Sequence, residues 1–226
     1  MPIIISPLDT DYYKLTMGQL VWKKYAEVPV RYAFINRTKA VNVAEFISEH
    51  ELRAELDHVR QLRYRDEELA YLAGITAAGR RIFRDDYLEF LCRLVLPPYE
   101  LWVHDGRYRL EFAGKWSTAI YWEIPALAII NELYCRALAG TAAGNDCTAE
   151  TGRRLLAGKI GKLRAYQGIK FADFGTRRRF SRAWQEFVLT ELKRELPGQF
   201  IGTSNVDLAR RLGVAPIGTF ATRCTW

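Results

Sequence analysis

The strongest constraint on the fold is the rhythm of the last quarter of the sequence, where predicted strands and helices alternate. β-rich segments at 170–175, 200–203 and 214–218 are separated by segments with helical spacing of apolar residues at 181–196 and 205–212. Such alternation with short loops is typical of parallel strands joined by right-handed crossovers. Because a closed α/β barrel needs about eight strands, three strands predict an incomplete barrel or an open sheet.

The earlier residues follow a mixed pattern that predicts an α+β fold. Helical spacing favours helices over 43–62, 65–73 and 85–92, and a first helix that runs through Trp22 with Asp9 or Thr10 as its cap. Alternating or β-rich runs predict strands at 28–36, 94–103, 108–112 and 116–121. An apolar helix over 124–138 closes this part, a glycine-containing linker follows at 140–144, and a basic helix covers 148–166. We therefore expect an N-terminal α+β domain over 1–138 and, over 139–226, the first βα units of a truncated α/β barrel or of an open sheet.

Composition excludes several classes of protein. Hydrophobic residues make up 49% and charged residues 26% of the chain, a globular balance. The net charge of +7 favours anionic partners, but no nucleic-acid motif is present and the arginines do not form a continuous stripe. The apolar stretch 124–138 is too short and too polar to span a membrane. Nucleic acid and membranes are therefore not the expected partners.

The cysteines and histidines indicate neither a metal site nor a disulfide framework. Cys92, Cys135, Cys147 and Cys224 form no C-x-x-C pair, and the first two lie in apolar segments that predict buried thiols. The three histidines are isolated and are expected at the surface. Without a signal peptide, we expect a cytoplasmic protein.

Polar and glycine-rich residues follow each of the last three predicted strands. They are 173–178, 202–205 and 218–219, and they combine glycine with hydroxyls or arginines. Functional groups gather at the carboxyl ends of parallel strands, where glycine N–H groups and arginine bind anions and Phe174 offers a flat face to a ring. A planar acid and a phosphorylated sugar both suit this chemistry. The alternatives are turn glycines, a core Phe174 and a solvated helix start at 177–179.

Five ordered segments together resemble the successive blocks of nicotinate phosphoribosyltransferases. They span Leu8 to Ala221 and read LDTDYYKLTMGQL, YAFINR, YWEIPALAIINELYCR, FADFGTRRRFS and FIGTSNVDLARRLGVAPIGTFA. The resemblance implies a type II phosphoribosyltransferase-like fold, in which an α+β domain packs on an incomplete α/β barrel, and a homodimer with sites near the subunit interface. It also implies an ATP-dependent, ligase-type glycosyl transfer.

The implied reaction joins nicotinate to 5-phosphoribosyl 1-diphosphate and yields nicotinate mononucleotide and pyrophosphate with ATP hydrolysis. This is the entry step of pyridine nucleotide salvage in NAD biosynthesis. The expected small-molecule partners are therefore nicotinate, phosphoribosyl diphosphate and ATP, and Mg2+ accompanies the phosphates.

The same resemblance implies the roles of five residues. Tyr13 reaches the pyridine site, Phe174 stacks on the ring, and Arg177 holds the nicotinate carboxylate or the nearby phosphate. Thr219 contacts nicotinate, and Ser204 lines the same pocket.

The sequence departs from the family pattern after Ala221. The family has a histidine there that ATP phosphorylates, and this sequence has Thr222. No catalytic residue is therefore assigned, and we expect a truncated and impaired copy of the enzyme; a single-base frameshift would explain the departure. The alternative is a non-catalytic binding or regulatory fragment that pairs with a full-length subunit and supplies Tyr13 to it. The strictness for nicotinate over nicotinamide stays open.

Overall fold

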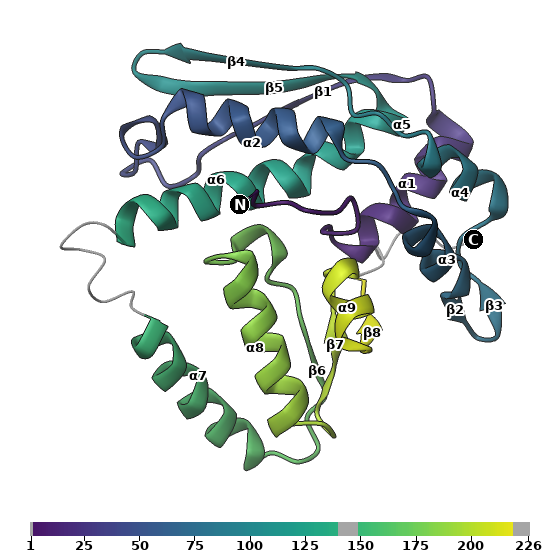
Figure 1. Cartoon of the computed structure of the whole chain (residues 1–226), viewed down its shortest axis with the longest axis vertical. Coiled ribbons are helices and arrows are strands. Elements are labelled where there is room, and N and C mark those ends of the chain that lie inside the picture. The colour runs from purple at the N-terminus through teal and green to yellow at the C-terminus, as the bar shows by residue number, and fades with distance from the viewer. Residues whose placement is uncertain (1, 140–148, 219–226) are drawn as a thin grey trace.

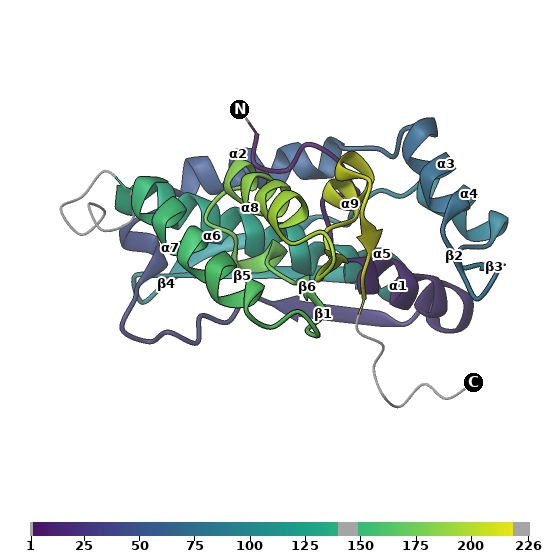
Figure 2. The same cartoon turned by 90° about the horizontal axis from the view of Figure 1, so that it is seen from below.

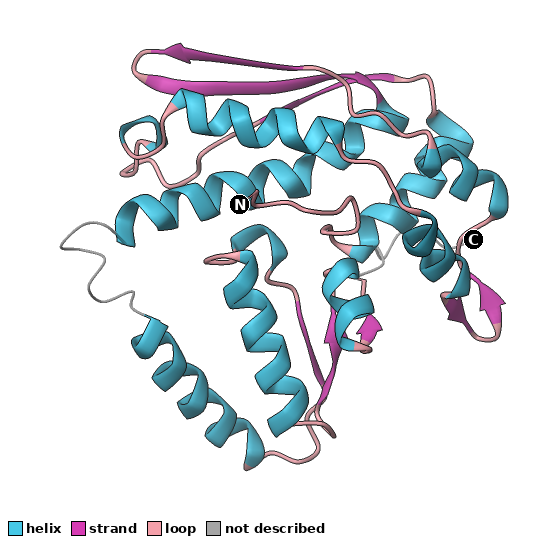
Figure 3. Cartoon of the chain, in the orientation of Figure 1, coloured by secondary structure: helices cyan, strands magenta, loops and turns pink. Residues whose placement is uncertain are grey.

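The protein is described by a computed structural model that covers residues 2–139 and 149–218. Its elements form an upper α+β part, a group of helices at one end, and a lower α/β part (Figure 1). The strands fall into three small groups, which Figure 3 shows in magenta. The predicted linker at 140–144, Cys147, Thr219, Thr222 and Cys224 lie outside the described residues.

The α+β part is built on an antiparallel sheet with the strand order β1-β5-β4. The strands are β1 (Pro29–Ala33), β4 (Tyr99–His104) and β5 (Arg107–Lys115). Helices α2 (Glu49–Gln61) and α6 (Glu123–Ala139) cover one face of this sheet (Figure 1). Because side chains alternate along a strand, Leu110 and Phe112 both point into this core, where Phe112 stacks on Trp122. Because Trp122 directly precedes α6, this contact positions the start of α6 against the sheet.

A second core joins α1 to the short helices at one end of the molecule. It contains α1 (Tyr12–Tyr25), α3 (Asp66–Gly74), α4 (Asp85–Cys92), α5 (Trp116–Ala119) and a 3-10 turn η2 (Ile120–Trp122), with a small hairpin β2 (Thr76–Ala77) and β3 (Arg80–Arg81) beside them. Gly18 allows α1 to approach closely, since a Cβ there would lie 2.1 Å from the Tyr121 hydroxyl oxygen. The Tyr121 hydroxyl is hydrogen-bonded to the Tyr87 hydroxyl, with 2.6 Å between the two oxygens. The middle of α1 therefore packs closely against Tyr121 of η2 and Tyr87 of α4.

The α/β part contains the predicted parallel strands, in the order β6-β7-β8. These are β6 (Phe171–Asp173), β7 (Phe200–Thr203) and β8 (Ala215–Pro216), with α8 (Arg182–Glu195) and α9 (Val206–Leu212) between them and α7 (Ala149–Arg164) packed on α8. Gly202 has φ +149°, and a Cβ there would lie 2.1 Å from the Ala215 carbonyl oxygen, so close pairing of β7 with β8 requires glycine. The βα rhythm is confirmed, and its place in a barrel stays a prediction.

The N-terminal segment is integrated into the α/β part. The Tyr12 amide donates to the Ser204 carbonyl at 2.7 Å, and the Val206 amide donates to the Thr10 carbonyl at 3.0 Å. Seen from below, α8 and α9 lie in front of α6 and the sheet (Figure 2). The predicted domain boundary at residue 138 remains a prediction. The first turn of α1 and the carboxyl end of β7 lie directly against each other.

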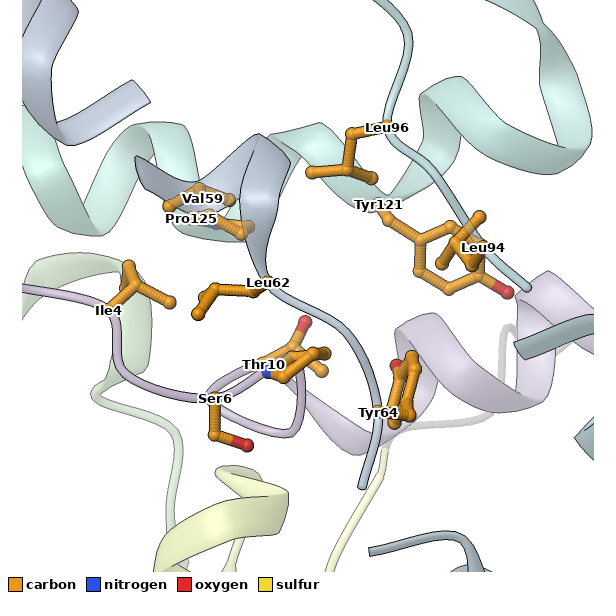
Figure 4. A pocket seen from close by; sticks show the side chains of 11 residues that line it. Ile4, Ser6, Thr10, Val59, Leu62, Tyr64, Leu94, Leu96, Tyr121 and Pro125 are labelled. Atoms are coloured by element: carbon orange, nitrogen blue, oxygen red, sulfur yellow. The ribbon is translucent and has the colours of Figure 1, made fainter. Parts of the chain in front are cut away.

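A small cavity of about 40 Å³ lies between the N-terminal segment and the residues of α2 and α6 that face it (Figure 4). Its walls are mainly apolar, from Ile4, Val59, Leu62 and Leu94, and Thr10 contributes a buried hydroxyl without a hydrogen-bond partner among the described residues. The volume suffices for about one or two water molecules. It is therefore a packing void and not the site of chemistry.

Two of the secondary-structure predictions are wrong for identifiable reasons. Residues 116–121 form α5 and the start of η2 instead of a strand, because this segment is buried on several sides and its apolar run has no clear period. The helix expected over 43–62 is a 3-10 turn η1 (Val43–Glu45) followed by α2. Ser48 starts α2 anew by accepting a hydrogen bond from the Glu51 amide at 3.2 Å.

The expected cap of α1 and the expected burial of two thiols also need correction. Asp11, not Asp9 or Thr10, is the N-cap residue, and the Asp9 carboxylate is instead bound to Arg179. Cys92 is exposed and Cys135 is half-buried. Both lie near the ends of helices, where an apolar sequence neighbourhood does not ensure burial.

The glycines of α7 provide a test of how this helix packs. A Cβ at Gly158 would meet no atom within 4 Å, whereas one at Gly152 would lie 2.7 Å from the Trp184 ring of α8. Gly158→Ala is expected to raise the free energy of unfolding by about 0.5–1 kcal/mol, because alanine costs less entropy in a helix. Gly152→Ala should give no gain. Urea denaturation of both variants checks this, and equal gains would contradict the contact between α7 and α8.

Candidate functional site

Four side chains from three distant segments meet where α1, α6 and η4 (Thr176–Arg178) converge. They are Tyr13 and Lys14 from the first turn of α1, Glu123 from the first turn of α6, and Arg177 from η4. We call them the Glu123 cluster, because the other three all bind Glu123. The cluster lies at the amino end of two helices, positions that favour a carboxylate.

The contacts of the Glu123 carboxylate are shared between its two oxygens. Arg177 Nη1 lies 2.9 Å from Oε1, and the Tyr13 hydroxyl donates to the same oxygen at 3.3 Å. Lys14 Nζ forms an ion pair with Oε2. The cations also flank the Tyr13 ring, at 5.1 Å from its centroid for Lys14 Nζ and 5.9 Å for the Arg177 guanidinium carbon. These are distances at which a cation is attracted to an aromatic face.

Asp11 supports the cluster from the buried side. Its carboxylate lies 3.5 Å from Arg177 Nε and accepts a hydrogen bond from the Ser204 hydroxyl at 2.7 Å. Ser204 is fully buried. Arg177 is therefore held by two carboxylates, Glu123 at Nη1 and Asp11 near Nε.

The electrostatic environment keeps Glu123 charged and Tyr13 neutral. Burial would raise the pKa of Glu123, but the hydrogen bond and charge of Lys14 and the charge of Arg177 outweigh burial and lower it. Burial and the neighbouring Glu123 charge raise the pKa of Tyr13. Burial also raises the pKa of Asp11, against the opposing effects of Ser204 and Arg177. At neutral pH the Tyr13 hydroxyl is thus a hydrogen-bond donor.

A pocket of about 540 Å³ opens beside the cluster. Glu123 and Arg177 form part of its wall, and Tyr13, which donates a hydrogen bond to Glu123, is not among the lining residues. The segment after β1 forms another part of the wall and adds Arg37, and Phe34 and Phe112 are among the apolar residues of the pocket. Arginines combined with apolar walls suit a planar anion, since the guanidinium binds a carboxylate and the apolar groups bind a ring.

The three consecutive arginines at 177–179 have different environments. Arg177 belongs to the cluster, and Arg178 is exposed on the pocket wall. Arg179 is buried, and its guanidinium binds both oxygens of Asp9 at 2.6 and 2.9 Å. Asp9 also accepts a hydrogen bond from Asn205 Nδ2 at 2.7 Å. This buried pair fastens η4 and the N-terminal segment together and so fixes the position of Arg177.

The structure brings two of the predicted site residues together, namely Tyr13 and Arg177. Phe174 is 49% exposed at the end of β6, and Ser204 lies behind Asp11 rather than on the pocket wall. Thr219 lies outside the described residues, as does Thr222. The ligand contacts assigned to all five residues remain predictions.

Sequence reasoning missed Lys14, Asp11 and Glu123. Lys14 and Asp11 flank Tyr13 in the segment DTDYYK, and a lysine at a position with apolar neighbours was an available signal of a buried ion pair. Glu123 begins the strongly apolar helix α6, where a carboxylate needs a partner. Neither signal identifies the partner, because the partners of Glu123 lie 54 and 110 positions away in the sequence.

Neither a metal site nor a membrane span is found in the described ranges. Residues 2–139 and 149–218 contain no group of three or more His, Cys, Asp or Glu side chains arranged to hold a metal ion. Among the helices of the same ranges, none is long and apolar enough to cross a bilayer.

Comparison with known proteins gives consistent matches along both parts of the chain. Residues 8–131 match the model of the nicotinate phosphoribosyltransferase N-terminal domain, and residues 169–226 match that of the nicotinate phosphoribosyltransferase family.

Solved structures of similar fold include a nicotinate phosphoribosyltransferase from Vibrio cholerae. It is 31% identical with a TM-score of 0.84, over 97% of this chain and 52% of that one. A nicotinate phosphoribosyltransferase from Porphyromonas gingivalis is 28% identical (TM-score 0.80, over 96% and 54%). A putative nicotinate phosphoribosyltransferase from Saccharomyces cerevisiae is also 28% identical (TM-score 0.81, over 98% and 55%). The chain thus spans about half the length of the structures that it matches.

Proposed function

Because the chain belongs to the nicotinate phosphoribosyltransferase family, we propose that its pocket binds nicotinate for transfer of a phosphoribosyl group. The product would be nicotinate mononucleotide, formed with pyrophosphate from 5-phosphoribosyl 1-diphosphate. The observation that carries this proposal is the pairing of Tyr13 with Arg177 beside the pocket. Both residues stand in the sequence blocks on which the family resemblance rests, and both carry chemistry that a pyridine carboxylate requires.

The reaction defines what these residues have to do. The ring nitrogen of nicotinate forms a bond to C1 of the ribose while the bond from C1 to the diphosphate oxygen breaks, and its electron pair leaves with pyrophosphate. The nucleophile is weak, so holding the ring in line with C1 supplies much of the rate. In our proposal Arg177 binds the carboxylate, the Tyr13 ring stabilises the position of Arg177, and Phe174 and Thr219 contact the pyridine.

Several features of the proposal rest on family resemblance alone. These are the phosphoribosyl diphosphate subsite, Mg2+ bound with the phosphates as substrate, and a homodimer with sites near its interface. ATP coupling is a further case. We propose that ATP stimulates this chain little, because Thr222 stands at the position of the family's phosphorylated histidine and cannot replace an imidazole in phosphoryl transfer.

Calorimetry and a product assay on the same purified chain test the proposal. We expect nicotinate to bind in the micromolar to millimolar range and nicotinamide to bind more weakly, since only nicotinate carries a charge for Arg177. Formation of nicotinate mononucleotide would then be followed with and without ATP. Binding without turnover would favour the fragment that acts with a full-length subunit, and equal binding of both pyridines would contradict the role of Arg177.

A further inference from the structure

Arg177 already holds a carboxylate in the structure. Glu123 Oε1 lies 2.9 Å from Arg177 Nη1, and both side chains line the pocket. The second carboxylate, Asp11, lies 3.5 Å from Nε on the buried side. A guanidinium presents its donors in a fixed planar fork. An anion that binds the Nη1–Nη2 end of the guanidinium from the pocket therefore has to compete with Glu123 for Nη1.

The cluster is also balanced in charge. Lys14 and Arg177 carry two positive charges, and Glu123 and Asp11 carry two negative charges. A balanced cluster attracts a free anion less than an unpaired arginine would. The strength of the Arg177–Glu123 pair therefore lowers the affinity of any anion that binds Arg177.

The two cations that bind Glu123 differ in their freedom to move. Lys14 is only 4% exposed and packs in the first turn of α1, whereas the Arg177 side chain is 40% exposed. If Arg177 turns toward a ligand, Glu123 keeps Lys14 and stays neutralised. The reverse exchange would leave a buried lysine without a carboxylate, which is costly. Arg177 is thus the partner that can be released.

We propose that Glu123 is an internal competitor that occupies Arg177 when the pocket is empty and sets how strongly a carboxylate or phosphate must bind to displace it. Glu123 is in this sense a specificity-determining and positioning residue. Weak or poorly shaped anions fail to displace it, while a planar carboxylate held also by its ring succeeds. The identity of the physiological anion as nicotinate rests on the proposed function, but the competition itself does not.

The test compares anion binding in variants that release Arg177 without changing the net charge. Glu123→Gln alone leaves Lys14 unpaired, so the main variant combines Lys14→Met with Glu123→Gln. It removes one charge of each sign, and neutral replacement of a buried ion pair is often tolerated. Glu123→Asp keeps the charge but shortens the side chain, which weakens its contact with Arg177. It is the variant to measure if the double variant does not fold. Cooperative thermal melting is checked for each protein before binding is measured.

Calorimetry with nicotinate, nicotinamide and inorganic phosphate gives the readout. We expect the double variant to bind nicotinate and phosphate about fivefold more tightly than the unchanged chain, the gain typical of removing a competing pair that is partly exposed. Glu123→Asp should show a smaller gain, and nicotinamide should be unaffected. In an Arg177→Gln background the gain should vanish, which a purely structural effect of Glu123 would not produce.

Several outcomes would overturn the inference. Weaker or unchanged anion binding in the double variant would show that Glu123 supports the bound state instead of competing with it. Absence of anion binding in every variant would show that Arg177 is not an anion site. A gain for phosphate without any binding of nicotinate would support the competition and refute the proposed function, so the two can fail separately.

Discussion

Replacement of Arg179 by methionine is expected to lower the free energy of unfolding by about 3–5 kcal/mol, since it leaves a buried carboxylate without its main partner. The side chains of Arg179 and Asp9 are 1% and 0% exposed, and the guanidinium binds both carboxylate oxygens. Asn205 and the more distant Arg182 Nε at 3.5 Å cannot replace a bidentate cation. Chemical denaturation followed by tryptophan fluorescence measures the change.

The adjacent Arg178 provides a matched control. It is exposed and forms no side-chain ion pair among the described residues, so Arg178→Met should change stability by less than about 0.5 kcal/mol. Combining Asp9→Leu with Arg179→Met should recover part of the loss, because apolar residues of similar size often replace buried ion pairs. If Arg178→Met and Arg179→Met lower the stability equally, the Asp9–Arg179 pair does not hold the N-terminal segment.

Arg177→Gln is expected to weaken nicotinate binding about 10- to 100-fold, the range for losing a charge-assisted pair of hydrogen bonds to a carboxylate. Glutamine keeps a donor but not the charge or the fork. Nicotinamide is neutral, and its affinity should change by less than about twofold on the same scale. Isothermal calorimetry with both ligands measures the ratio directly.

A control for the pocket comes from Arg178→Gln, which removes a charge from the same wall without touching Glu123 or Asp11. Its effect on nicotinate should be only about twofold to threefold, as expected for a solvated charge at some distance. Parallel losses for nicotinate and nicotinamide in Arg177→Gln would indicate that the substitution disturbs the pocket as a whole. They would contradict a specific contact with the carboxylate.

The fold was predictable wherever a segment has one clear period and one clear boundary signal. α4 and β7 occur at the predicted residues, and α8 begins after Ser181, whose hydroxyl caps it by accepting a hydrogen bond from the Trp184 amide. The prediction for residues 116–121 failed because most of this segment is buried, which removes the contrast between apolar and polar faces. The hairpin at 76–81 was missed because its strands are only two residues long.

The candidate site was predictable only in its residue types. Strand ends rich in glycine and arginine pointed to the region of Arg177, and the resemblance added Tyr13. The carboxylates that hold these residues could not be inferred, because Glu123 and Asp11 act through partners that only the tertiary fold brings together. Neighbouring arginines were equally indistinguishable in sequence, although Arg177 faces a pocket and Arg179 is in the core.

The interlocking of the N-terminal segment with the α/β part has a consequence for how the protein forms during synthesis. Asp9 and Asn205 are hydrogen-bonded although they are 196 positions apart. Pairings of such high contact order form late and slowly, since the residues between them have to be present and the two segments brought together first. Tyr13 leaves the ribosome long before Ser204, yet the neighbouring Tyr12 amide binds the Ser204 carbonyl. A nascent chain should therefore acquire its final pocket only after the residues that follow β7 have emerged. Until then the early helices offer a target for chaperones.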